Sequence, residues 1–122
     1  MSEHENAWPK ELRVSPDRKN LTVSFADGRS YAIEAELLRV RSPSAEVQGH
    51  SPGQWVTVGG KAGVTIAKVL PVGNYAVRLA FDDGHDTGIF TWSFLSELGA
   101  AKDQRWAEYI AELAQKSMTR TR

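Results

Sequence analysis

The sequence predicts an α+β domain, in which a twisted antiparallel sheet built from hairpins is accompanied by short helices and a C-terminal amphipathic helix. Three observations support this fold class. Several short runs alternate apolar and polar residues, as half-buried strands do. Asp-Gly pairs at 27–28 and 83–84 separate such runs and are strong hairpin signals. The segment 102–116 instead repeats its apolar residues with helical spacing.

The N-terminal half predicts an arm, three strands and a short helix. Residues 1–9 are polar and without periodicity, which is typical of a flexible arm. Strands are expected at 11–15, 20–26 and 30–33. Residues 34–42 predict one or two helical turns, and the helix should end where Ser42 precedes Pro43, because a residue before proline avoids the helical conformation.

The middle of the chain is rich in glycine and proline. Residues 43–63 therefore predict a long loop, interrupted by a short extended piece at 54–58. Within it, Gly59-Gly60-Lys61 lacks the other residues of a phosphate-binding P-loop and is interpreted as loop only. A loop of this length in a small domain is typical of a functional or mobile segment.

The C-terminal half predicts three strands and two helices. Strands are expected at 64–70, 75–81 and 88–90. A short helix over 92–98 should take Thr91 or Ser93 as its N-cap and end at Gly99. The polar, basic tail that follows residue 116 is expected to fray.

The last helix carries one apolar stripe. Its members are Trp106, Tyr109, Ile110 and Leu113, which follow one another at helical spacing. Such a stripe either completes the domain core, which is the commoner role, or joins two copies of the chain. The oligomeric state therefore stays open at this point.

Two segments of the chain resemble each other. Residues 21–33 and 77–90 both run from an apolar strand through Phe, one further residue and Asp-Gly into another extended stretch. Two such hairpins are expected to pair into one antiparallel sheet. The likeness reflects either an internal duplication or the general similarity of hairpins, and the sequence favours neither.

Composition excludes several classes of protein. Lys and Arg together number 15, as do Asp and Glu, so the charge excess that marks nucleic-acid binding is missing. The chain has no cysteine, which excludes disulfides, thiol catalysis and thiolate metal sites. No apolar run is long enough to cross a membrane, and the polar start is unlike a secretory signal. These observations predict a cytoplasmic protein with neither nucleic acid nor membrane as a partner.

Two stretches offer candidate functional residues. His85 lies in the most polar run of the chain, beside Asp83, where it could ligate a metal, act as a general base, or belong to a solvated turn. His4 and His50 are too scattered to complete a metal triad with it. The run 39–44 holds two arginines that suit an acidic partner or a phosphate, or that simply complement the end of a solvated helix.

Three stretches together carry a family resemblance: LTVSFADG (21–28), LLRVRSPSA (37–45) and FDDGHDTGIFTWSFL (81–95). They resemble small bacterial proteins of unknown function that are named for their similarity to the N-terminal domain of gamma-butyrobetaine hydroxylase. The resemblance covers roughly residues 10–98 and implies an α+β domain. Similar domains are fused to P-loop ATPases that assist iron–sulfur cluster assembly, which implies an adaptor role.

The resemblance also implies a zinc site that this chain has lost. In the eukaryotic hydroxylases the domain holds a structural zinc through three cysteines and one histidine. The histidine corresponds to His85, whereas the cysteine positions fall on Ser42, Ser44 and either Glu46 or Val47. Because serine is a poor zinc ligand, neither zinc nor iron is expected here. The oxygenase chemistry belongs to a barrel domain outside the resemblance.

The sequence thus predicts a flexible arm (1–9), a family-like domain (10–98) and a C-terminal helix with a basic tail (99–122). The expected function is a non-enzymatic binding or adaptor module that needs no cofactor and contacts a protein partner. Its expected binding residues are Arg39, Arg41, Ser42, Ser44, Asp83, Gly84 and His85. The alternative is a metal-dependent accessory protein linked to oxygenase or iron–sulfur chemistry that uses His85 and its neighbouring aspartates.

Overall fold

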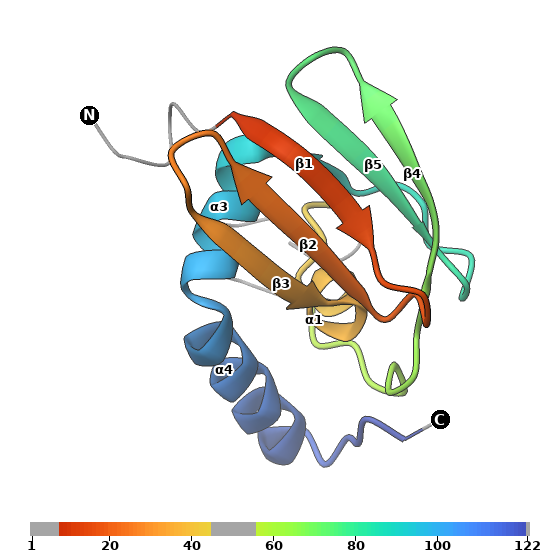
Figure 1. Cartoon of the computed structure of the whole chain (residues 1–122). Coiled ribbons are helices and arrows are strands. Elements are labelled where there is room, and N and C mark those ends of the chain that lie inside the picture. The colour runs from red at the N-terminus through yellow and green to blue at the C-terminus, as the bar shows by residue number, and fades with distance from the viewer. Residues whose placement is uncertain (1–7, 45–55, 122) are drawn as a thin grey trace.

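The structure, a computed structural model, describes residues 8–44 and 56–121 (Figure 1). The predicted α+β class is confirmed, because helices accompany two three-stranded antiparallel sheets. The elements are β1 (Pro9–Val14), β2 (Asn20–Phe25), β3 (Ser30–Glu34), α1 (Ala35–Val40), β4 (Ile66–Val72), β5 (Ala76–Phe81), β6 (Ile89–Thr91), α3 (Trp92–Ala100) and α4 (Lys102–Gln115). Most of the predicted arm, and residues 54–55 of the predicted extended piece, lie outside the described residues.

Each sheet is a meander in which consecutive strands are neighbours. The first has the order β1-β2-β3 and the second the order β4-β5-β6. The two similar segments form β2–β3 and β5–β6, so their expected pairing into one sheet is wrong. Alternation along a strand predicts which face is buried, and an Asp-Gly pair predicts a hairpin turn. Neither pattern predicts which strand distant in sequence pairs with the hairpin. Here a preceding strand extends each hairpin instead.

The two sheets share one hydrophobic core. Alternate residues of β2 and β5 point into it, and the core also takes in apolar residues of α1, α3 and α4. The turn before β2 ties the sheets together, since Arg18 Nε donates to the carbonyl of Ile66 at 2.6 Å. The Ile66 amide in turn donates to the carbonyl of Arg18 at 2.8 Å.

Helix α3 packs on the first sheet, along its β3 side (Figure 1). Thr91 is its N-cap and accepts a hydrogen bond from the Phe94 amide at 3.1 Å, which decides between the two expected caps. The expected end at Gly99 is wrong, because the helix continues to Ala100. A Cβ on Gly99 would lie 2.5 Å from Tyr31 Cγ, so glycine here allows the helix to approach β3 closely.

Helix α4 covers the core with Tyr109 and Leu113, while Ile110 of the same predicted stripe is 38% exposed. The stripe therefore packs mainly within the domain. The expected fraying of the tail is wrong for residues 117–121, because Met118 packs against the core and the backbone of Thr119 and Arg120 accepts hydrogen bonds from the 60–62 segment. Among the described residues, no helix is both long and apolar enough to cross a membrane.

Candidate functional site

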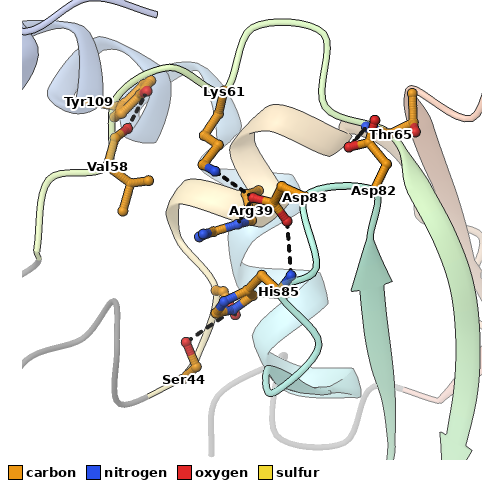
Figure 2. Close-up of polar contacts among 10 residues, drawn as sticks. Arg39, Ser44, Val58, Lys61, Thr65, Asp82, Asp83, His85 and Tyr109 are labelled. Carbon is orange, nitrogen blue, oxygen red and sulfur yellow. Dashed lines mark hydrogen bonds and ion pairs between the residues drawn. The ribbon is translucent and has the colours of Figure 1, made fainter. Parts of the chain in front are cut away.

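The candidate site is built on the turn between β5 and β6. The Phe81 amide donates to the carbonyl of His85 at 2.9 Å, and the Gly84 amide donates back to the carbonyl of Phe81 at 3.1 Å. Gly84 has φ +90°, a conformation that other residues adopt only with strain. Asp83 Oδ1 accepts from the His85 amide at 3.0 Å and so locks the turn (Figure 2).

Two cations from other parts of the chain converge on the second oxygen of Asp83. Arg39 Nε, from α1, lies 2.7 Å from Oδ2, and Lys61 Nζ lies 2.6 Å from it (Figure 2). The side chains are largely buried, with exposed fractions of 11% for Arg39, 10% for Asp83 and 20% for Lys61. Arg39 is thus paired, and the expected alternative of a solvated helix end does not describe it.

The charge of Asp83 is set by competition between burial and hydrogen bonding. Burial by itself raises the pKa of this carboxyl, but hydrogen bonds from Lys61, the His85 amide and Arg39 outweigh it and hold the pKa well below its ordinary value. Within the described part of the chain, Arg39 Nη1 is buried without an acceptor. Unmatched buried donors of this kind are rare in proteins.

The His85 ring extends the site toward the end of α1. Its Nε2 lies 3.2 Å from Ser42 Oγ and 3.3 Å from Ser44 Oγ. Ser42 is fully buried and Ser44 is 4% exposed, whereas His85 is half-buried. A Cβ on Gly88 would lie 2.1 Å from Ser42 Oγ, so a glycine at this position lets the strand after the turn approach the serine. We call the group formed by Arg39, Ser42, Ser44, Lys61, Asp83 and His85 the Asp83 cluster.

The resemblance implies that Ser42, Ser44 and His85 stand at zinc-ligand positions, so we asked whether these side chains fit zinc. The His85 ring does face both hydroxyls. A neutral hydroxyl is nevertheless a poor substitute for a thiolate, and no group of three or more His, Asp or Glu side chains within residues 8–44 and 56–121 is arranged to hold a metal ion. The described donor set therefore does not fit zinc.

Arg41, another expected binding residue, lies apart from the Asp83 cluster. It is 1% exposed, donates to Glu112 of α4 and lies 5.8 Å from the ring centroid of Tyr109. Tyr109 donates its hydroxyl to the carbonyl of Val58 at 2.7 Å, and burial raises its pKa to about 12. This arrangement joins α1, α4 and the 56–58 segment, and it holds the chain that leads to Lys61.

The structure therefore brings together six of the seven expected binding residues, all except Arg41, and Gly84 contributes by shaping the turn. It adds Lys61, which was not expected from the sequence. Lys61 follows two glycines in the predicted loop, where no periodicity indicates the direction of its side chain. The only available signal was the presence of a cation beside glycines, which is too common to identify a site. The three expected zinc-ligand equivalents include position 46 or 47, which lies outside the described residues.

Solved structures with the same fold are available for comparison. One solution NMR structure is 48% identical, with a TM-score of 0.80, and the match covers 93% of this chain and 90% of that one. A second NMR structure is 40% identical, with a TM-score of 0.83 and coverage of 98% and 89%. No match is found among curated proteins.

A crystal structure from Acidithiobacillus ferrooxidans is 38% identical, with a TM-score of 0.64, and the match covers 82% of this chain and 99% of that one. That protein is described as having unknown function and as belonging to the DUF971 family. The family described as "Gamma-butyrobetaine hydroxylase-like, N-terminal" matches residues 12–96, which is well over half of the chain and includes the whole Asp83 cluster. The chain therefore belongs to the gamma-butyrobetaine hydroxylase-like N-terminal family.

Proposed function

We propose that this domain is a non-enzymatic adaptor module that binds a protein partner through the Asp83 cluster. The observation that carries the proposal is the convergence on Asp83 of Arg39 and Lys61, side chains from two segments distant in sequence from the turn. Lys61, with 20% of its side chain exposed, and the half-buried His85 are the most accessible members of the cluster, and Arg39 pairs with the same aspartate as Lys61. Rigidly supported polar groups of this kind suit specific recognition, because little side-chain freedom is lost on binding.

The charge around the cluster favours a polar partner surface. Asp82 and Asp86 are exposed and lie close in sequence to the largely buried Asp83, whose own charge is paired with Lys61. A surface that carries both signs provides orientation and specificity rather than bulk electrostatic attraction. This agrees with the formal net charge of zero for the whole chain.

Affinity capture from a lysate of the source cells tests the proposal. The wild-type domain is compared with Lys61→Ala and with Lys68→Ala, an exposed lysine of β4 that serves as the matched control. Loss of a central contact costs about 1–2 kcal/mol, so Lys61→Ala should reduce the retained partner roughly tenfold. Lys68→Ala should retain it fully. Circular dichroism confirms that both variants are folded.

Two results would contradict the adaptor proposal. Equal capture by the wild type and by a variant with Arg39, Lys61 and His85 all replaced would remove the cluster from any binding role. Stoichiometric zinc or iron in untagged purified protein would instead favour the metal-dependent accessory alternative.

A further inference from the structure

A second polar site lies at Glu36, one helical turn before Arg39 on α1. Glu36 is only 6% exposed, and both of its carboxylate oxygens accept hydrogen bonds from Arg120, at 2.8 and 2.7 Å. The arginine is much more accessible, with 44% of its side chain exposed. A buried carboxylate thus forms the base of a site that a guanidinium enters from the solvent side.

The surroundings of Glu36 suit a guanidinium in particular. The Arg120 guanidinium lies 5.0 Å from the ring centroid of Trp106, a distance at which cation–π attraction is significant. The paired hydrogen bonds to Glu36 use both of its oxygens, a geometry that arginine offers and lysine does not. The hydrogen bond with Glu36 is also the main cause that raises the pKa of Arg120, and Glu34 adds to it.

The segment that carries Arg120 is held independently of this side chain. Met118 packs against the core, and the carbonyl of Thr119 accepts from the Gly60 amide at 2.9 Å. The carbonyl of Arg120 itself accepts from the Ala62 amide at 2.9 Å. Removal of the guanidinium would therefore leave the walls of the site in place.

Open space adjoins the Arg120 side chain. A cavity of about 190 Å³ is lined by Glu34, Glu36 and Arg120 among others. A larger cavity of about 480 Å³ shares Glu34 with it and reaches the Trp106 side chain. Neighbouring residues of an incoming segment could occupy this space while its arginine is bound.

We propose that Glu36 and Trp106 form a binding site for an arginine side chain, which Arg120 occupies in cis and which an arginine of a protein partner takes in exchange. The proposal does not depend on the Asp83 cluster, because it uses other side chains. Arg120 itself identifies the ligand chemistry, because its guanidinium is paired with both oxygens of Glu36 and lies over the Trp106 ring.

The test uses the full chain with Arg120→Ala, which empties the site and keeps its walls. N-acetyl-arginine amide is titrated while the melting temperature is followed, and N-acetyl-citrulline amide is the uncharged ligand of the same shape. We expect the arginine ligand to raise the melting temperature saturably by about 3 °C and the citrulline ligand to leave it unchanged. The double variant Glu36→Gln/Arg120→Ala should respond to neither ligand. Wild-type chain should need at least a tenfold higher concentration, because Arg120 competes.

Equal responses to both ligands would overturn the proposal, as would a response of the double variant or an equal response of the wild type and Arg120→Ala. If Arg120→Ala does not fold, Arg120→Gln replaces it in the same titration, since it keeps a polar side chain. The matched arginine control is Arg13→Ala, which removes an exposed side chain paired only with nearby Glu11 among the contacts described, and which should respond as the wild type does.

Discussion

The two Asp-Gly turns of this domain are nearly identical locally and entirely different in their surroundings. In the first, the Phe25 amide donates to the carbonyl of Arg29 at 2.8 Å and the Gly28 amide donates to the carbonyl of Phe25 at 3.0 Å. The second repeats both bonds between Phe81, Gly84 and His85. In each turn the aspartate also accepts from the amide two residues later, at 3.1 and 3.0 Å.

The difference lies in what packs over each aspartate. Asp27 is 54% exposed and pairs with Arg29 of its own turn. Asp83 is 10% exposed and receives Arg39 from α1 and Lys61 from the preceding segment. The same local chemistry thus yields a surface turn in one sheet and a candidate binding site in the other. The candidate site at Asp83 therefore depends on the side chains that the tertiary structure packs over the turn, and not on the turn sequence.

The largest effect that should separate the two turns comes from neutralising each aspartate. Asp83→Asn preserves the shape of the side chain but leaves two largely buried cations without their carboxylate, so we expect it to destabilise the fold by about 3 kcal/mol. Asp27→Asn should cost less than about 1 kcal/mol, because its ion pair is largely exposed. Urea unfolding of both variants measures the difference, and equal losses of stability would show that the two ion pairs are equivalent.

A smaller effect should come from the close contact behind the second turn. Gly88→Ala would place a Cβ against the fully buried Ser42, and overpacking of this kind costs about 2 kcal/mol. Replacing Ser42 with alanine in the same chain removes the hydroxyl and should recover part of that loss. Thermal unfolding of the single and double variants checks this, and purely additive losses would show that the two residues do not meet.

The two turn glycines should give matching effects of about 1 kcal/mol each. Gly28 has φ +96° and Gly84 has φ +90°, and at neither position would a Cβ meet another atom within 4 Å. Replacement by alanine therefore adds only backbone strain, which is the same in both turns. A difference in urea unfolding larger than about 1 kcal/mol between Gly28→Ala and Gly84→Ala would mean that the turns are not equivalent.

The smallest expected effect is on the pH dependence of the stability that Asp83 contributes. The pKa of Asp83 is held below its ordinary value of 3.8, so its contribution is present above that pH and is lost as the pH falls toward its value in the folded state. The stability gap between wild type and Asp83→Asn should accordingly narrow below about pH 4. Urea unfolding from pH 7 to pH 3 measures it, and a constant gap would contradict the ion-pair assignment.

Much of the fold follows from local sequence patterns. Alternation located the strands of both hairpins, and the apolar stripe located α4, because each pattern depends on residues close in sequence. The partition into two sheets, the continuation of α3 through Gly99 and the ordered 117–121 segment were not predicted. Each depends on contacts between distant residues, such as Gly99 with Tyr31.

The residues of the candidate site were likewise predicted only in part. The family motifs placed Ser42, Ser44 and His85 together, and the structure confirms that these side chains meet. Arg41 was expected among them, but α1 turns it toward Glu112 instead. Lys61 was missed, because only the bonds that hold the 56–62 segment bring it to Asp83.

The most direct test of the central claim compares equivalent positions of the two turns. His85 and Arg29 each follow the Asp-Gly pair, so His85→Ala and Arg29→Ala are matched variants for partner capture. If the second turn alone contributes to a binding surface, His85→Ala loses the captured partner while Arg29→Ala retains it, with both variants folded by circular dichroism. Equal retention by the two variants, or loss in Arg29→Ala alone, would contradict the account.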